Sequence, residues 1–185
     1  MQRHGMPTPS NSIDLRIDDA KEKLGEMFAC LLAQQGRKMI WLPEYDEVAD
    51  WLGDNKGRGL FLFGNHGRGK SLLCRYVLPA ILLTHCRKVV TVLDVQAMNA
   101  DIDTALSKPI VSIDDIGTEE VVNNYGNRRL AFAELMDAAE KHNHLVMVST
   151  NLNMDALRTT YGERTLERIK ATTRRILFSG NSLRG

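Results

Sequence analysis

The residues from Gly64 to Ser71 carry the clearest chemical pattern in the chain. They read Gly-Asn-His-Gly-Arg-Gly-Lys-Ser and match the phosphate-binding pattern G-x-x-x-x-G-K-[S/T]. Glycines let successive backbone N–H groups turn toward one concave site, and the N-terminus of a following helix adds positive potential there. We expect Lys70 to reach the outer phosphates of a nucleotide and the Ser71 hydroxyl to ligate Mg²⁺. The pattern therefore predicts a site for nucleotide phosphates and their Mg²⁺.

The flanks of this loop support that prediction. Residues 59–63 form a short apolar run typical of a buried strand, and apolar residues recur at helical spacing over 72–78. Strand, loop and helix is the order that the motif requires, and a chance glycine-rich turn is the alternative. His66 and Arg68 stand at unspecified positions, so we expect solvated side chains there, although the Arg68 guanidinium could touch a phosphate. The predicted cofactor-binding residues of the loop are Gly64, Asn65, His66, Gly67, Arg68, Gly69, Lys70, Ser71 and Leu72.

A second apolar run, at 110–115, ends in two carboxylates. An acid at the end of a hydrophobic strand fits the Walker B role, in which Asp114 holds Mg²⁺ through water. Asp115 would then orient or deprotonate the attacking water, although it is one methylene shorter than the Glu that is commoner there. Asn151 follows another apolar run and could hydrogen-bond the γ-phosphate or the attacking water. The alternative is a strand end that carries acids by chance.

Strands and helices alternate along the chain. Continuous apolar runs predict strands at 59–63, 88–93, 110–115, 145–150 and 175–178. Helical spacing of apolar residues predicts helices at 13–35, 45–52, 72–78, 97–106, 127–140, 154–161 and 163–169. Strands that are apolar on both faces and separated by helices are typical of a parallel sheet covered on both sides. The predicted fold class is therefore α/β, with the polar ends of three strands meeting at one edge.

Length and composition fit one domain. The chain has 185 residues, of which 43% are hydrophobic and 25% charged. It shows no apolar run of membrane-spanning length and no signal-peptide core, and its three cysteines are scattered, so we expect a cytoplasmic protein with no membrane partner. From Arg158 to the end there are seven basic and two acidic residues. This basic segment is either a solvated face or a surface for phosphates.

We divide the chain near residue 40. Residues 1–11 are polar, contain two prolines and are expected to be disordered. The helix expected at 13–35 has an apolar stripe that either packs on the domain, which we favour, or docks a partner. Residues 1–40 are thus predicted to form a tail with an N-terminal helix, and residues 41–185 the nucleotide-binding core.

Together these motifs resemble the AAA+ ATPases of the bacterial helicase-loader type, the DnaC family, and its transposition-helper relatives, the IstB family. The resemblance covers about residues 40 to 184 and rests on the phosphate loop, Ile-Asp-Asp-Ile-Gly at 113–117, Ser-Thr-Asn-Leu at 149–152 and Tyr-Gly-Glu-Arg-Thr-Leu-Glu-Arg at 161–168. It implies a P-loop NTPase core with a five-stranded parallel sheet of order 5-1-4-3-2. It also implies ATP and Mg²⁺ as cofactors and hydrolysis of ATP to ADP and phosphate. No C-terminal lid of helices is expected after Gly185.

The resemblance further implies self-association, because an arginine of the last of these segments reaches the γ-phosphate of a neighbouring subunit. Arg164 and Arg168 are the candidates, and we favour Arg168. The alternative is that these arginines pair with Glu163 and Glu167. Arg184, in a segment that resembles the end of the family's core, would sense nucleotide in its own subunit.

Single-stranded DNA is a further implied ligand, which family members hold in a central channel. Tyr125 could stack on a base, and Arg128 and Arg129 could meet phosphates, with ordinary surface charge as the alternative. The implied protein partner is a replicative helicase, which the helix at 13–35 would contact, or a transposase. Two other functions stay open: a small-molecule P-loop kinase, which the paired acids at 114–115 disfavour, and a nucleotide-gated binding module with little hydrolysis.

Overall fold

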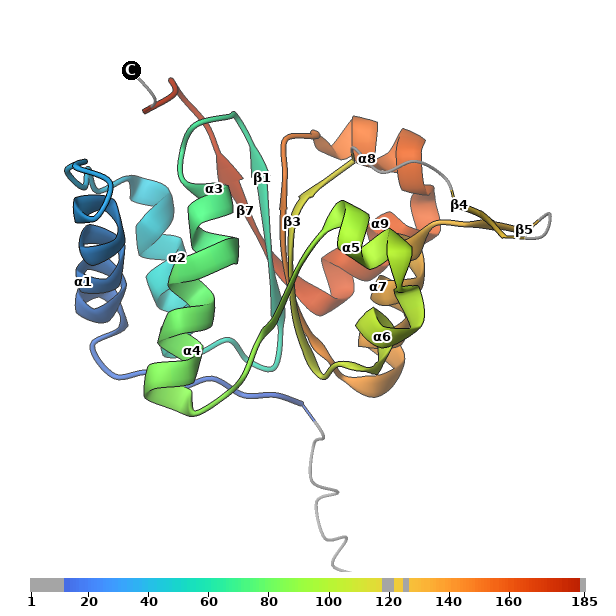
Figure 1. Ribbon diagram of the computed structural model, residues 1–185, viewed down its shortest axis with the longest axis horizontal. Coiled ribbons are helices and arrows are strands. Elements are labelled where there is room, and N and C mark those ends of the chain that lie inside the picture. The colour runs from blue at the N-terminus through green and yellow to red at the C-terminus, as the bar shows by residue number, and fades with distance from the viewer. Residues whose placement is uncertain (1–11, 118–121, 125–126, 184–185) are drawn as a thin grey trace, which may run out of the picture.

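The centre of the molecule is a sheet of five parallel strands in the order β2-β3-β6-β1-β7 (Figure 1). The computed structural model describes residues 12–117, 122–124 and 127–183. The strands of the sheet are β1 (Gly59–Gly64), β2 (Thr91–Asp94), β3 (Ile110–Ile116), β6 (Leu145–Thr150) and β7 (Thr173–Phe178). When only these strands are counted, the order is 5-1-4-3-2 read from the opposite edge. The predicted α/β fold and strand order are therefore confirmed.

Helices cover both faces of the sheet, as predicted (Figure 1). One face carries α1 (Ala20–Ala33), α2 (Pro43–Gly53), α3 (Lys70–Leu72), a π-helical turn (Leu73–Val77) and α4 (Leu78–Cys86). The other carries α5 (Val95–Ala100), α6 (Ile102–Ser107), α7 (Ala131–His142), α8 (Met154–Tyr161) and α9 (Glu163–Thr172). Among the described helices, none has the length and apolar character that spanning a membrane requires.

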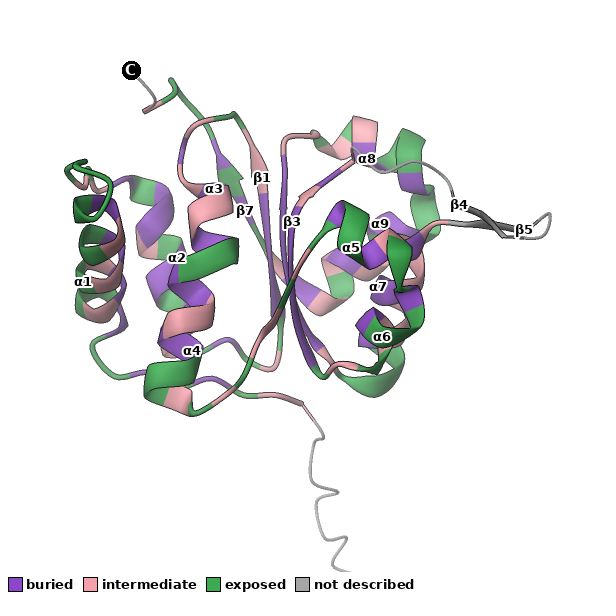
Figure 2. Cartoon of the chain, viewed as in Figure 1, coloured by how far each residue is buried: buried purple, intermediate pink, exposed green. Residues whose placement is uncertain are grey.

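Side chains along each central strand alternate between two separate cores. Leu60 and Leu62 pack on the face that carries α1, α2 and α4, whereas Phe61 packs on the face that carries α7 and α9. In the neighbouring strand, Met147 joins the first core and Val148 the second. Figure 2 shows the same arrangement, with buried strands in the middle and helices exposed on their outer sides. Burial on both faces explains why these strands read as unbroken apolar runs.

The N-terminal helix begins later than predicted, at Ala20 instead of Ile13. The segment before it is extended because its backbone is bonded to a buried side chain. The N–H of Leu15 donates to Asn55 Oδ1 at 2.7 Å, and Asn55 Nδ2 donates to the Ile13 carbonyl at 2.9 Å. These bonds take backbone groups that a helix would need. The apolar side of α1 is buried in the first core, so it packs on the domain, as we favoured.

The helix after the phosphate loop is irregular at 73–77, where it forms a π-helical turn. Pro79 accounts for this, since it has no N–H to give the Arg75 carbonyl and its ring would clash with that carbonyl in an α-helix. Another carbonyl of the turn, that of Cys74, accepts a hydrogen bond from Ser112 Oγ of β3 at 2.7 Å. The π-helical turn sets the direction in which the Arg75 side chain projects from the helix.

A hairpin separates β3 from α7. Its strands, β4 (Val122–Asn124) and β5 (Asn127–Arg129), pair antiparallel and project from the body of the molecule (Figure 1). The helix predicted at 127–140 therefore begins only at Ala131, because the preceding backbone bonds across the hairpin. The helix predicted at 97–106 is also divided, by Asp101, into α5 and α6.

Candidate nucleotide-binding site

The phosphate loop joins β1 to α3 and turns tightly at its glycines. Gly69 has a φ of 91°, a value that glycine adopts readily and other residues rarely do. A Cβ on Gly69 would lie only 2.6 Å from the Tyr45 hydroxyl oxygen, so the loop also needs glycine for space. Lys70 is buried, and its Nζ donates to the carbonyl oxygens of Gly64 and Asn65 at 3.0 and 2.6 Å. The lysine charge therefore lies inside the curve of the loop.

Behind the loop, Arg68 and Glu44 form a buried ion pair, with residue exposures of 8% and 7%. Nε and Nη2 of Arg68 both donate to Glu44 Oε1, at 3.1 and 2.7 Å. The same oxygen accepts the N–H of Ser179 at 3.1 Å, and Arg68 Nη1 donates to the Asn181 carbonyl at 3.0 Å. The expectation of a solvated Arg68 side chain is thus wrong. Its guanidinium joins the loop to α2 and to the segment after β7, and a phosphate contact from it is not supported.

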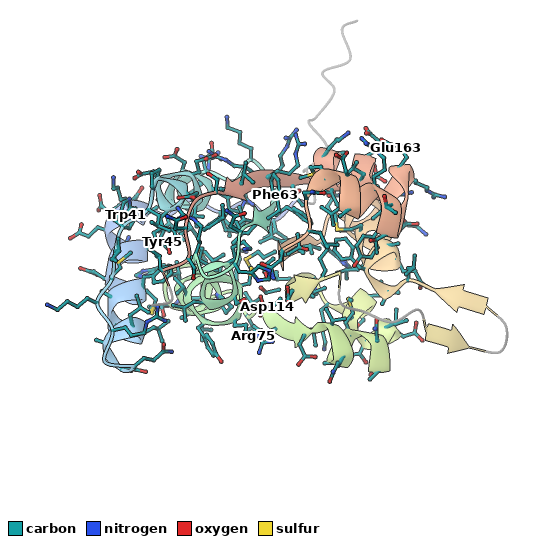
Figure 3. All side chains as sticks on the ribbon, turned by 90° about the horizontal axis from the view of Figure 1, so that it is seen from above. Trp41, Tyr45, Phe63, Arg75, Asp114 and Glu163 are labelled. Carbon is teal, nitrogen blue, oxygen red and sulfur yellow. The ribbon has the colours of Figure 1, made fainter. Side chains whose placement is uncertain are left out.

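Tyr45 of α2 supports the loop from the same side. Its hydroxyl donates to the Arg68 carbonyl at 2.9 Å, and its ring lies 4.9 Å from that of Phe28 and 5.7 Å from that of Trp41 (Figure 3). Burial, aided by the nearby Glu44 carboxylate, raises the pKa of Tyr45 to about 12. The hydroxyl therefore stays protonated at neutral pH and remains a donor to the loop.

The two carboxylates near the end of β3 lie beside the end of β6. Asp114 is buried, and its Oδ2 accepts a hydrogen bond from Arg75 Nε at 2.6 Å while its Oδ1 accepts one from Ser149 Oγ (Figure 3). Asp115 has a φ of 58°, and its Oδ1 accepts from Asn151 Nδ2 at 2.7 Å. The structure thus brings together Asp114, Asp115 and Asn151, which come from two neighbouring strands.

Sequence reasoning missed two members of this cluster. Arg75 lies one helical turn after Ser71, and the i, i+4 spacing from the loop serine was the signal that could have found it. Ser149 directly precedes the Thr150–Asn151 pair at the end of β6. The sequence predicts a polar segment at 149–151 but assigns no role to Ser149, and only the strand register places its hydroxyl on Asp114.

A cavity of about 580 Å³ opens beside the phosphate loop, within the size range of small-molecule sites. The loop and its helix contribute His66, Gly67, Gly69, Lys70, Ser71 and Leu72 to its lining. Asp115, Asn151 and Arg75 also line the cavity, together with Phe28 and Leu32 of α1. The lining therefore includes polar groups that suit phosphates and apolar side chains that suit an aromatic base.

Two residues with oxygen atoms that could ligate Mg²⁺ lie in or beside the cavity. The Ser71 hydroxyl lines the cavity, and the Asp114 carboxylate is bonded to Arg75, which also lines it. Mg²⁺ prefers oxygen ligands and is usually held by one or two carboxylates together with substrate phosphates. Within the described residues no group of three or more His, Cys, Asp and Glu side chains could hold a metal ion. By the chemistry of their oxygen atoms, Ser71 in the cavity lining and Asp114 beside Arg75 would each suit a Mg²⁺ ion that arrives with a nucleotide.

The two arginines expected to act across a subunit interface differ in their surroundings. Arg168 Nη1 lies 2.8 Å from Asp137 Oδ1, its Nε lies 2.9 Å from Glu140 Oε2, and its side chain is only 14% exposed. The Arg164 side chain is 77% exposed, and its Nη2 lies 3.7 Å from Asp137 Oδ2. The alternative pairing with neighbouring glutamates is not found, since Glu163 instead pairs with an arginine of α8. Arg168 is therefore engaged, whereas Arg164 is accessible.

The structure does not place the remaining predicted residues in the cavity. Tyr125 and Arg184 lie outside the described residues. Arg128 and Arg129 belong to β5 of the projecting hairpin.

Comparison with known proteins extends the resemblance in fold. No family model and no curated protein sequence matches the chain. The crystal structure of DnaI is 24% identical over 69% of this chain and 73% of that one, with a TM-score of 0.51. The crystal structure of the DnaC helicase loader is 16% identical over 89% of this chain and 93% of that one, with a TM-score of 0.56. The structure of AMPPCP-bound DnaA from Aquifex aeolicus is 11% identical over 77% of this chain and 49% of that one, with a TM-score of 0.56. The chain thus shares the fold of these proteins.

The buried ion pair behind the loop gives a test of stability. We expect Glu44→Ala to lower the free energy of unfolding by about 3–5 kcal/mol, because it leaves the Arg68 charge buried and unpaired. The double variant Glu44→Leu/Arg68→Met, which removes both charges and keeps the volume, should recover most of this loss. Urea unfolding followed by circular dichroism measures both changes. Glu26→Ala, at an exposed site on α1, is the control, and a Glu44→Ala loss no larger than the control's would contradict the expectation.

Proposed function

We propose that this chain is an AAA+ ATPase that binds ATP with Mg²⁺ and hydrolyses it in the cavity beside the phosphate loop. The observation that carries the proposal is that Lys70, Asp115 and Asn151 line this one cavity. Binding phosphates needs only the loop, whereas hydrolysis also needs groups that position water at the terminal phosphate. The fold shared with AMPPCP-bound DnaA supports a nucleotide as the ligand. A cytoplasmic location is part of the proposal.

Each residue of the site has a distinct role in this proposal. Lys70 would turn from the loop carbonyls to the outer phosphates, and Ser71 with Asp114 would hold the metal. Mg²⁺ bound with the nucleotide would offset the negative charge of the phosphate oxygens. Asp115 takes a proton from water as the water oxygen attacks the γ-phosphorus, while the bond to the ADP oxygen breaks. Asn151, 2.7 Å from the Asp115 carboxylate, keeps that carboxylate aimed at the water.

The proposal includes a site shared between subunits, with Arg164 as the arginine that a neighbour supplies. Neither Arg164 nor Arg168 lines the cavity of its own chain. Arg168 is held by two carboxylates of α7 and is largely buried, so freeing it would break two close ion pairs. Arg164 is exposed, so it can meet phosphate oxygens at little cost. The preference drawn from sequence, for Arg168, is reversed on these grounds.

Single-stranded DNA and a replicative helicase are the proposed partners. The β4–β5 hairpin carries Arg128 and Arg129 and projects from the body of the molecule (Figure 1). A lone two-stranded hairpin is only marginally stable, so binding a partner would stabilise it. The fold shared with the DnaC helicase loader favours a helicase as protein partner. A transposase is the alternative that the resemblance leaves open.

A nucleotide-gated binding module with little hydrolysis is the second candidate. One observation favours it: Asp114 is ion-paired with Arg75 at 2.6 Å, and this pair competes with metal binding. The short Asp115 side chain would also slow the attack of water. The two candidates share the binding site and differ in turnover.

Substitution of Asp115 separates binding from hydrolysis. Asp115→Asn should keep the affinity for Mg²⁺-ATP and lower the hydrolysis rate by about 10²-fold or more, because the amide cannot accept the proton. Calorimetry measures the binding, and phosphate release measures the rate. Asp18→Asn, at an exposed site, is the matched control. Equal rates for Asp115→Asn and the wild type would refute the assigned role, and a wild type that binds ATP without phosphate release would favour the second candidate.

Mixed subunits test the shared site. Arg164→Ala should lower ATPase activity by about tenfold or more at concentrations where the protein associates, because the neighbour's phosphates lose a cation. Asp115→Asn subunits should also be inactive alone. Mixing the two should restore activity, since some interfaces then join an intact Arg164 to an intact Asp115. Arg168→Ala is the comparison and should chiefly lower the melting temperature. No recovery on mixing would argue against an arginine acting between subunits.

The hairpin gives a test of DNA binding. Arg128→Ala/Arg129→Ala should weaken binding to single-stranded DNA and reduce the dependence of affinity on salt, because two phosphate contacts are lost. Fluorescence anisotropy of a labelled oligonucleotide at several salt concentrations measures both. Arg16→Ala, at an exposed residue of the N-terminal segment, is the control. Unchanged affinity and salt dependence in the double variant would exclude the hairpin arginines as a DNA contact.

A further inference from the structure

We propose that Arg75 is an internal cation that holds the carboxylate of Asp114 until a Mg²⁺-nucleotide binds, and that it must release this carboxylate for the metal to be held. This inference rests on the proposed function and adds a residue to it. Arg75 would be a positioning residue, which sets how strongly nucleotide binding depends on Mg²⁺.

The geometry of the pair is direct. Arg75 Nε lies 2.6 Å from Asp114 Oδ2, and the two side chains lie together in Figure 3. The Asp114 side chain is 6% exposed, whereas that of Arg75 is 41% exposed and lines the cavity. The carboxylate is therefore fixed in the interior, and the guanidinium approaches it from the cavity. Of the two partners, Arg75 is the one with space to move.

Asp114 needs a positive charge because it is buried. A carboxylate moved out of water is costly unless it is paired and hydrogen-bonded. Its Oδ1 accepts a hydrogen bond from Ser149, and its Oδ2 accepts one from Arg75, so each oxygen already has one donor within the chain. The Arg75 guanidinium is protonated at any physiological pH, so the pair joins two full charges. A water bound to Mg²⁺ would have to donate to one of these same two oxygens.

The fold places Arg75 in this position through its helix. Arg75 lies within the π-helical turn at 73–77. Its own carbonyl is the one to which Pro79 has no N–H to donate. Turns of this kind inside helices are rare and frequently occur at functional sites. The same helix begins with Lys70 and Ser71, so phosphates bound at its start also act on the residue that holds Asp114. One element thus joins nucleotide binding to release of the acid.

A second acceptor is available to Arg75 after release. Asp94 ends β2 and lies opposite Asp114 in the pairing of β2 with β3. Phosphate oxygens in the cavity offer further partners. The guanidinium therefore need not give up ionic contact when it leaves Asp114.

The test compares binding of a non-hydrolysable ATP analogue with and without Mg²⁺ by calorimetry. For Arg75→Ala we expect the affinity with Mg²⁺ to rise about tenfold and the affinity without Mg²⁺ to change little, because the competitor for Asp114 is gone. The melting temperature without nucleotide should fall, since Asp114 is left unpaired. Pro79→Ala, which keeps the charge but allows a regular helix, should shift the Mg²⁺ dependence in the same direction. Arg16→Ala, an exposed arginine outside the site, is the control.

Three outcomes would overturn the inference. Weaker binding of the Mg²⁺ complex by Arg75→Ala would show that Arg75 acts on the phosphates instead. An unchanged ratio of the affinities with and without Mg²⁺ would show that the pair is only structural, and in both cases the proposed function would stand. A wild-type chain that binds no nucleotide under either condition would refute the proposed function itself, and the inference with it.

Discussion

Parallel pairing is the constraint on which the rest of the molecule depends. Because all five strands of the sheet run the same way, their carboxyl ends meet at one edge. β1 delivers the phosphate loop there, β3 delivers the two acids, and β6 delivers Ser149 and Asn151. The pairing of β3 with β6 shifts register between Ile113 and Ile116, where the acids lie. Such an irregularity re-aims side chains, and here Asp114 bonds to Ser149 while Asp115 bonds to Asn151.

The described part of the site balances its charges with partners drawn from different elements. Glu44 of α2 pairs with Arg68 of the loop, and Asp114 of β3 pairs with Arg75 of the following helix. Lys70 is bonded to loop carbonyls that can release it to a stronger acceptor. The first pair is buried behind the loop and fixes its shape, whereas the other two cations line the cavity. The phosphate loop thus lies between the Arg68–Glu44 pair, which has a structural role, and the two cations that can contact a ligand, Lys70 and Arg75.

Sequence patterns predicted the sheet because local and long-range signals agreed. Strands buried on both faces are apolar throughout, and the glycine loop between a strand and a helix left little choice of fold. The patterns failed where distant contacts decided the structure. Asn55 keeps residues 13–17 out of the N-terminal helix, and Pro79 turns a regular helix pattern into a π-helical turn. Sequence patterns predict a solvated Arg68, because its partner Glu44, far away in sequence, becomes its neighbour only in the fold.

The N-terminal helix α1 also contacts residues that are distant in sequence. Its apolar stripe could have been an unattached docking face, but Phe28 packs on Tyr45, and Tyr45 donates to the Arg68 carbonyl in the phosphate loop. Phe28 and Leu32 also line the nucleotide cavity. A displacement of α1 would therefore move Phe28 and Leu32 in the lining of the cavity and would also shift Tyr45, which donates to the phosphate loop. A partner bound to the exposed side of α1 and a nucleotide in the cavity would act on one packed unit. Coupling between them then needs only a small shift of α1, because dense packing transmits such shifts.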